Sequence, residues 1–487
     1  MSIDGARKTA RAGVLLGFAQ FWLALAGYVV AVVLGRSLGP EQFGIYGIVY
    51  SLLLGIELIG RLGVPQALSR LIAGGKQPTD EIVRTGFAAT LVVSLVLFAV
   101  FWIGAPQLAL VFDLPNGTRL LRIAALDIPI HMMYVACVHV VNGQRRFVQE
   151  AAATIVYATA RAIGVLLLLL IGLSIEAALI ANIAASLIGF IYVASRVPAR
   201  YFLPSRRHLP VIIKVATPIA LFSAGSQVLT RLDLWALGAI GERASAATIG
   251  KYVAATSLAK LPNMLFFVLS SLLIPLVAKA IADGGRDTAS RYVQETSRFL
   301  IVFLLPAVVL CAVQAHDVME LCFGIEYRAG GDLLQLLIVA YGLAYTVMMT
   351  LAAILIALDR ATWSAWLTLS AVAFGLAFNF VLVRTYGAVG AGWAAVLTMG
   401  LTCLVAGMLV RRELRTPLID AGVLLRGILA VSATAWIGVQ LETSGTVFFL
   451  ELGGLLLVYL VMLAALGVIR AGDVGMLRPG AGRPSAP

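Results

Sequence analysis

Long apolar stretches, separated by short charged or Gly/Pro-rich breaks, occupy almost the whole chain. They fall at about 12–34, 43–63, 86–110, 119–142, 150–172, 176–195, 215–240, 251–278, 297–315, 333–357, 361–383, 388–410, 421–441 and 446–469. Each stretch is close to the about 20 apolar residues that a helix needs to cross a bilayer. The stretches are continuous, as in Val165–Ile171, whereas membrane β-strands alternate apolar and polar residues. The pattern therefore predicts an all-α polytopic membrane protein with about 14 transmembrane helices.

Composition narrows the class of protein further. Hydrophobic residues make up 61% of the 487 residues and charged residues only 12%, against about 25% charged residues in soluble domains. These values exclude a soluble enzyme, a secreted disulfide scaffold and a disordered chain. The cysteines are scattered and none forms a CxxC pair, so neither a metal site nor a redox pair is indicated; they are Cys137, Cys311, Cys322 and Cys403.

The basic residues are distributed unevenly between alternate loops. With the N-terminus on the cytoplasmic side, 26 of the 36 Lys and Arg residues fall in cytoplasmic segments and seven in outer ones, while three lie inside spans. Lys and Arg concentrate on the cytoplasmic side of membrane proteins. We therefore expect a multi-pass protein of the cytoplasmic membrane with both termini in the cytoplasm. The same asymmetry accounts for the net charge of +12 without a nucleic-acid partner.

An internal repeat divides the expected helices into two sets. Gly44–Tyr46 opens the second span after a short outer loop, and Gly250–Tyr252 opens the eighth span in the same way. Ile72–Gly75 and Ile281–Gly285 follow these two spans. Six spans separate the copies, so both halves have the same orientation, as in a parallel repeat. We expect an N-terminal lobe at 1–196, a cytoplasmic linker at 197–214, a C-terminal lobe at 215–415, two further helices at 416–470 and a cytoplasmic tail at 471–487.

Motifs of enzymatic chemistry are missing from the sequence. Gly75-Lys76 and Gly250-Lys251 lack the rest of a phosphate-binding loop, and neither a Ser/His/Asp set nor a zinc-protease motif occurs. A membrane polymerase or ligase would need catalytic residues on a long outer loop. The longest charged one, at about 316–332, holds Asp317, Glu320 and Glu326 in no recognisable constellation. We expect a protein that is not an enzyme and that holds no metal or cofactor.

Ionisable residues inside the spans are the strongest candidates for function. A charge at mid-bilayer costs about 2.5–3.5 kcal/mol on insertion scales, so it usually faces a wet or paired interior. Arg161 lies near the centre of the fifth span, and Arg231 and Lys260 lie on polar arcs of the seventh and eighth spans. Proline and glycine residues could bend these two helices, as in transporters with interrupted helices; they are Pro218, Gly225, Pro262 and Pro275. Purely structural pairing of these three cations is the alternative.

Carboxylates and a histidine accompany the cations. Asp233 could neutralise one of them or bind a coupling cation. Asp127 and His131 are four residues apart on one helical face, which is consistent with an ion or proton site or with a simple hydrogen-bonded pair. Glu57 and Arg61 are also four apart, which favours a local ion pair at the cytoplasmic end. Four tyrosines are more often packing residues or interfacial anchors than platforms that stack on sugars; they are Tyr46, Tyr50, Tyr341 and Tyr345.

The loop segments resemble a known family. The segment GRSLGPEQFGIY at Gly35–Tyr46 looks like the first-loop motif of polysaccharide transporters in the multidrug/oligosaccharidyl-lipid/polysaccharide exporter superfamily. The segments LDLWALG at Leu232–Gly238, Gly250–Tyr252 and KLPN at Lys260–Asn263 look like the matching motif of the second half. The resemblance covers nearly the whole chain and implies fourteen spans in two lobes.

The resemblance also implies a function. Such proteins are flippases of polyprenyl-pyrophosphate-linked oligosaccharides, for O-antigen of lipopolysaccharide, capsule, exopolysaccharide or related polymers. It implies membrane lipids and a lipid-linked oligosaccharide as partners, together with a polysaccharide polymerase or assembly proteins. Related lipid II flippases carry cationic cavity residues, and Arg231 and Lys260 match these by location, with Arg161 as a third contributor. Cation-coupled drug antiporters of the same superfamily are the alternative, and Asp127 and Asp233 keep it open.

Overall fold

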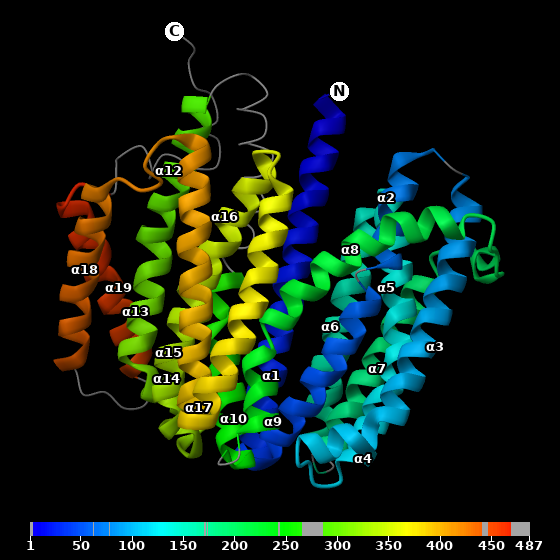
Figure 1. Ribbon diagram of the computed structural model, residues 1–487, viewed down its shortest axis with the longest axis horizontal. Helices are drawn as coiled ribbons and strands as arrows, with labels where there is room; N and C mark the ends of the chain where they lie inside the picture. The colour runs from blue at the N-terminus through cyan, green and yellow to red at the C-terminus, as the bar shows by residue number, and fades with distance from the viewer. Residues whose placement is uncertain are drawn as a thin grey trace. The chain divides into compact units, whose positions relative to one another are not determined.

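The computed structural model describes residues 3–61, 63–76, 78–169, 172, 174–241, 244–264, 286–440 and 447–468, and every regular element within these ranges is a helix (Figure 1). Nine of the described helices are long and apolar enough to cross a membrane. Two of the nine contain a break at a glycine, Gly39 in α1 (Ile3–Arg61) and Gly387 in α17 (Ala361–Leu414). Both glycines have positive φ, which a residue with a Cβ rarely adopts. Each of these helices therefore holds two of the predicted spans.

The chain divides into two compact units. The first comprises Met1–Ser257, Cys322–Gly330 and Thr368–Thr398, and the second Leu258–Leu321, Gly331–Leu367 and Met399–Pro487. The predicted linker at 197–214 lies inside the first unit, and the division of the chain into two repeat-related lobes stays a prediction. The described helices of the first unit besides α1 are α2 (Val64–Gly74), α3 (Thr79–Val111), α4 (Gly117–Ala125), α5 (Asp127–Gly143), α6 (Phe147–Leu169), α7 (Ile175–Ala194), η1 (Ala199–Phe202), α8 (Leu209–Leu229), α9 (Leu232–Ile240), most of α10 (Ala246–Ala259), η3 (Ile325–Gly330) and the middle of α17.

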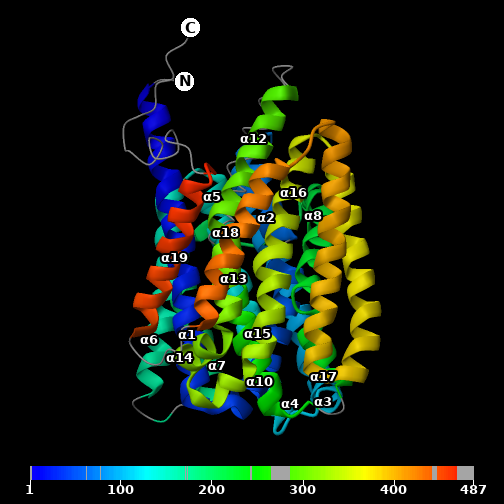
Figure 2. The same cartoon turned by 90° about the vertical axis from the view of Figure 1, so that its left-hand side faces the viewer.

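The second unit is also helical over its described part. Figure 2 shows α18 (Ala421–Gln440) and α19 (Val447–Ala465) beside α13 (Leu305–Val313), and these three helices contact one another. The remaining described elements are α12 (Arg286–Phe299), η2 (Leu300–Leu304), α14 (Ala315–Phe323), α15 (Gly331–Leu337), η4 (Ile338–Tyr345) and α16 (Thr346–Ala357). The elements η2 and η4 are π-helical.

The predicted fold class is confirmed, with corrections at three places. All fourteen apolar stretches overlap described helices. The stretch at 119–142 is two helices, α4 and α5, and the stretch at 215–240 is α8 and α9. The helix α8 already begins at Leu209, inside the predicted linker, because Pro210 at its start needs no hydrogen-bonded N–H. The second half of the stretch at 251–278 and the repeat copy at Ile281–Gly285 lie outside the described residues.

The two Gly-containing repeat motifs pack against each other in the first unit. A Cβ placed on Gly44 would lie 2.8 Å from the Gly250 amide nitrogen, and a Cβ placed on Gly250 would lie 2.8 Å from the Pro40 carbonyl carbon. The neighbouring Gly47 faces the side chain of Val253 in the same way. Small residues let helix backbones approach closely inside a membrane. The glycines therefore set the distance between α10 and the second half of α1.

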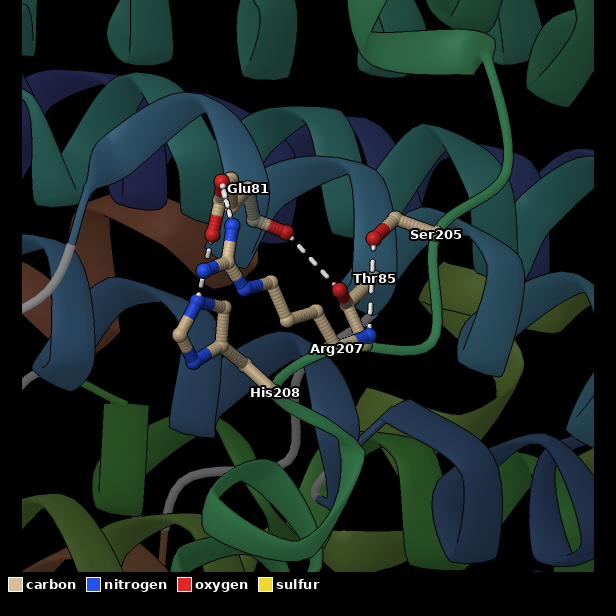
Figure 3. A network of polar contacts seen from close by, with 5 residues as sticks. All are labelled: Glu81, Thr85, Ser205, Arg207 and His208. Atoms are coloured by element: carbon tan, nitrogen blue, oxygen red, sulfur yellow. Dashed lines mark hydrogen bonds and ion pairs between the residues drawn. The ribbon is translucent and has the colours of Figure 1, made fainter.

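The segment that follows α7 is attached to the N-terminal end of α3. Arg200 pairs with Asp80 at 2.8 Å. Glu81 accepts from Arg207 at 2.8 Å and from His208 at 2.7 Å (Figure 3). The Phe202 ring packs 5.1 Å from the Phe87 ring. The arginine partners are largely exposed, so these pairs add little stability, and they fix the direction in which the chain enters α8.

Candidate functional site

Polar side chains gather in the interior of the first unit, between α1, α5, α6 and α7. These helices contact one another extensively (Figure 1), and most of their residues are apolar. Asp127 is 1% exposed and Glu57 2% exposed. A buried charge or polar group is tolerated only when it is paired or hydrogen-bonded. The partners of these side chains therefore indicate what the interior can hold.

Asp127 and His131 both reach across to α7. The Asn182 amide donates to Asp127 Oδ2 at 2.6 Å, and the His131 ring nitrogen Nδ1 lies 3.2 Å from the Ser186 hydroxyl oxygen. The same hydroxyl also hydrogen-bonds Asp127. The sequence places Asp127 and His131 on one face of a helix, and the structure adds the α7 residues that complete the set. The spacing of residues along one helix cannot predict which residues of another helix will hydrogen-bond to it.

Glu57 meets Asp127 from the opposite side. The two carboxyl groups are within hydrogen-bonding reach of each other. Arg61 acts on Glu57 through its charge, while the side-chain contact of Glu57 goes to Asp127 on α5. The expected ion pair of Glu57 with Arg61 stays a prediction. The break at Gly39 turns the chain, so that the second half of α1 brings this carboxyl group to α5. Such a contact between distant helices could not be read from the sequence.

Arg161 on α6 lies among tyrosines. Its guanidinium carbon is 4.8 Å from the centre of the Tyr50 ring, and it hydrogen-bonds the Tyr46 side chain. The Tyr46 and Tyr50 rings stack at 5.4 Å. Both carboxyl groups, of Glu57 and Asp127, act on the guanidinium through their charge. A guanidinium held over aromatic faces keeps donors available for an anion such as a phosphate.

Two tryptophan hydrogen bonds on α1 could not be predicted from the sequence. The Trp22 indole donates to Thr159 at 2.9 Å, and the Trp235 indole donates to Ser51 at 3.1 Å. Trp22 and Ser51 lie on α1, and their partners lie on α6 and α9. Tryptophan in an apolar run has no positional signature, because such residues are common at membrane interfaces.

Arg231 lies at an interruption between two helices. It forms a turn with Thr230 after α8 and is the N-cap residue of α9. The predicted polar arc of the seventh span assumed one continuous helix over residues 215–240, so this prediction is wrong across the break. The side chains of 221–227, including Ser223, Ser226 and Gln227, lie outside the described side chains. Asp233, 2% exposed, accepts from the Tyr252 hydroxyl at 2.5 Å and from the Leu234 N–H at 2.9 Å.

Lys260 also lies at an interruption. It forms a turn directly after α10, and helical residues resume at Leu261. Pro262 explains the break, because proline removes a backbone donor and clashes with the preceding turn. In the second unit, the Lys260 ammonium group lies 4.5 Å from the centre of the Tyr341 ring. Arg231 belongs to the first unit and Lys260 to the second, so their joint action on one substrate stays a prediction.

Interrupted helices, cations on aromatic rings and buried carboxyl groups in an apolar bundle together define a class of protein. They are features of membrane transporters, in which broken helix ends and intramembrane charges form binding sites. Among the described residues, no group of three or more His, Cys, Asp or Glu side chains is arranged to hold a metal ion.

Residues 33–329 match the family described as "Polysaccharide biosynthesis protein", and the chain belongs to this family. Together with the relatives and solved structures described next, this match confirms the predicted membership among the polysaccharide transporters.

Named relatives are transport proteins. The chain is 23% identical over 320 residues to the "Succinoglycan biosynthesis transport protein ExoT" of Rhizobium meliloti. The matched region is 65% of this chain and 63% of that protein, which is less than two thirds of the relative's length. It is 20% identical over 393 residues to the "Probable low-salt glycan biosynthesis flippase Agl15" of Haloferax volcanii, which covers 80% of each chain.

Solved structures share the fold at low identity. The structure titled "Lipid II flippase MurJ, inward closed conformation" has a TM-score of 0.79 at 14% identity and covers 93% of this chain and 98% of that one. An inward-facing multidrug resistance MATE family transporter of the MOP superfamily has a TM-score of 0.64 at 15% identity and covers 83% of this chain and 99% of that one. The protein therefore has the fold of a flippase or transporter of this superfamily and is a multi-pass membrane protein.

Proposed function

We propose that this protein is a flippase that moves polyprenyl-pyrophosphate-linked oligosaccharides from the cytoplasmic to the outer face of the cytoplasmic membrane, by alternating access, for cell-surface polysaccharide biosynthesis. The observation that carries the proposal is the position of Arg161. This cation lies in the interior of an apolar bundle, on the Tyr50 ring and beside Tyr46, where a charge needs a functional or structural reason.

The chemistry of the substrate requires such a cation. A pyrophosphate cannot be moved through hydrocarbon without compensation, because stripping the water from an isolated anion costs tens of kcal/mol. Guanidinium groups bind phosphate oxygens through two parallel hydrogen bonds. The polyprenyl tail can stay in the lipid while the head group crosses. Because the cytoplasmic side is electrically negative, outward movement gains about 2.3 kcal/mol per negative charge per 100 mV. Outward flipping therefore needs no ATP in principle.

Arg231 and Lys260 are the proposed further contacts of the pyrophosphate. Both lie at interruptions of their helices, where backbone groups are released for binding. Asp233 would then tune the charge of Arg231 or bind a coupling cation. Both termini are proposed to be cytoplasmic from the distribution of Lys and Arg. The printed names of the relatives, a succinoglycan transport protein and a glycan flippase, support a glycan substrate.

A cation-coupled multidrug antiporter is the second candidate. The likeness to MATE transporters favours it at the level of fold, and the buried carboxyl groups of Asp127 and Asp233 are the residue type that such transport would use. The cations inside the spans distinguish the two, because a cationic drug would be repelled by them and an anionic lipid attracted.

Expression in a strain that lacks its own glycan flippase tests the proposal. Surface glycan should be restored by the wild type and lost in Lys260→Gln at normal protein level, while Lys260→Arg should keep part of it. Arg384→Gln is the matched control, because Arg384 also lies over an aromatic ring, Phe380 at 4.3 Å, but is exposed. Full glycan export by a Lys260→Gln, Arg231→Gln double variant would overturn the assignment of these residues. Drug resistance without glycan export would favour the antiporter.

A further inference from the structure

The carboxyl groups of Glu57 and Asp127 form a direct contact in the interior of the first unit. The two side chains come from α1 and α5, are 2% and 1% exposed, and lie within hydrogen-bonding reach of each other. An ionised carboxylate only accepts hydrogen bonds. A hydrogen bond between two carboxyl groups therefore requires that one of them carries a proton.

The surrounding groups supply too few donors for two carboxylates. Asn182 donates to Asp127 Oδ2 at 2.6 Å, and the Ser186 hydroxyl also bonds Asp127. Asp127 Oδ1 and Glu57 Oε1 are nevertheless buried without a hydrogen-bond partner. A proton held between the two carboxyl groups would add the donor that this set lacks. This observation is independent of the acidic character of the cluster.

His131 extends the network at its other end. Its Nδ1 bonds the Ser186 hydroxyl at 3.2 Å, while its Nε2 is buried with no hydrogen-bond partner. If the Ser186 hydroxyl donates to Asp127, Nδ1 carries the proton that Ser186 accepts, and Nε2 keeps a lone pair. His131 is then neutral and positions the hydroxyl that contacts the carboxyl pair.

The carboxyl pair is coupled to Arg161 by charge. Both Glu57 and Asp127 act on this guanidinium, and Arg61 acts on Glu57 as well. With both carboxyl groups ionised, their two negative charges balance the two arginines. With one proton bound, the set carries one uncompensated positive charge. A proton on the pair therefore makes Arg161 more attractive to an anion.

The titratable and charged groups around the pair come from three helices. They are Tyr46, Tyr50 and Arg61 on α1, His131 and Tyr134 on α5, and Tyr157 and Arg161 on α6, while α7 contributes the non-titrating Asn182 and Ser186. Tyrosine and arginine keep their protons near neutral pH. With His131 neutral, the carboxyl pair is therefore the group whose proton can change in that range.

We propose that Glu57 and Asp127 form a proton-binding site whose occupation strengthens the binding of an anionic phosphate group at Arg161. The assignment of the anion rests on the proposed function, while the proton site stands on the carboxyl contact. By linkage, substrate that binds at Arg161 takes up a proton at the pair, and release of the proton weakens the hold on the substrate.

Infrared spectroscopy of the purified protein tests the proton site directly. The wild type should show the carbonyl band of a protonated carboxylic acid, which shifts in D₂O and disappears as pH rises. The band should be lost in Glu57→Gln and in Asp127→Asn, since the amide donates the hydrogen bond instead. Glu150→Gln is the matched control, because Glu150 is another partly buried carboxyl group of this unit and accepts from Asn142 at 2.7 Å.

Two infrared results would overturn the proton site. A wild-type protein without the band at any pH at which it stays folded would overturn the proton site. Persistence of the band in both single variants would overturn it too. If the variants fold poorly, the isotope shift and pH dependence of the wild-type band still decide the question.

Binding of farnesyl pyrophosphate tests the coupling to Arg161. Calorimetry in two buffers of different ionisation enthalpy should show uptake of up to one proton per bound probe in the wild type. The affinity should fall by up to about tenfold per pH unit through the titration of the pair, as a one-proton linkage requires. Glu57→Gln mimics the protonated pair, so it should bind tightly without proton uptake. The ratio of the Glu57→Gln affinity to the wild-type affinity at each pH cancels the effect of the probe's own titration.

Three results would change the account in different ways. Equal pH dependence and proton uptake in Glu57→Gln and the wild type would overturn the coupling. A dependence of affinity on Na⁺ in place of K⁺, with no dependence on pH, would overturn the proton in favour of sodium. Absence of probe binding in a wild type that keeps the infrared band would count against the proposed substrate and support the proton site alone.

Discussion

Replacement of Gly250 by alanine tests the close approach of the two repeat motifs. A methyl group there would lie 2.8 Å from the Pro40 carbonyl carbon and 3.1 Å from the Gly44 nitrogen. Both contacts are to backbone atoms, so no side-chain rotation can relieve them. The helix α10 must instead shift away from α1, which would loosen the contact of Gly47 with Val253 as well.

The expected magnitude follows from two opposing terms. Alanine in place of glycine stabilises a helix by roughly 0.5–1 kcal/mol. Forcing an extra methyl group into a packed interior costs typically about 1–3 kcal/mol. We expect Gly250→Ala to lower the free energy of unfolding by about 1–2 kcal/mol. Gly27→Ala in α1 is the control, because a Cβ there has nothing within 4 Å, and it should be neutral or slightly stabilising.

Thermal unfolding of the purified protein in one detergent measures both variants. At about 2.1 cal/mol/K of unfolding entropy per residue, a chain of 487 residues loses about 1 °C in Tm for each kcal/mol. Gly250→Ala should therefore lower Tm by about 1–2 °C, and Gly27→Ala should leave Tm unchanged or raise it slightly. Equal Tm values for Gly250→Ala and Gly27→Ala would refute the close backbone contact between α1 and α10.

Further predictions concern other contacts, each measured by thermal unfolding. Ser174→Ala should cost about 1 kcal/mol, since Ser174 Oγ accepts the Ala177 N–H at 3.2 Å as an N-cap; Ser174→Asp should restore the stability, and failure to do so would contradict the cap. Tyr252→Phe should cost about 1.5–3 kcal/mol because it removes a hydrogen bond from the buried Asp233, and an unchanged Tm would contradict that bond. Arg200→Ala should change stability by less than about 1 kcal/mol, because its ion pair with Asp80 is exposed; a larger loss would show that the pair carries the attachment of this segment.

Periodicity and apolar length were sufficient for the fold class. Continuous apolar runs identify helices because each must satisfy its own backbone hydrogen bonds in lipid. Breaks inside a run are harder to see. The turn at Thr230–Arg231 contains neither glycine nor proline, so no local signal separates α8 from α9, whereas Pro262 does mark the turn at Lys260.

The candidate site was predicted only in part. Each ionisable residue stood out because charges are rare in apolar runs, and Arg161, Asp127 and His131 were singled out on that ground. Their partners were not, because the contact of Glu57 with Asp127 depends on how α1 packs against α5. In the sequence, Glu57 is explained by an ion pair with Arg61, four residues further along the helix. The role of Tyr50 was also missed, since a tyrosine that packs and a tyrosine that carries a guanidinium look alike in sequence.

Translocation by the purified protein tests the central claim most directly. Proteoliposomes would hold a fluorescently labelled polyprenyl-pyrophosphate oligosaccharide, and a membrane-impermeant quencher would report the fraction of label that changes leaflet. The wild type and Arg384→Gln should move the lipid at the same rate, Arg161→Lys at a reduced rate, and Arg161→Gln no faster than protein-free liposomes. Wild-type rates in a folded Arg161→Gln variant, or no translocation by the wild type, would contradict the account.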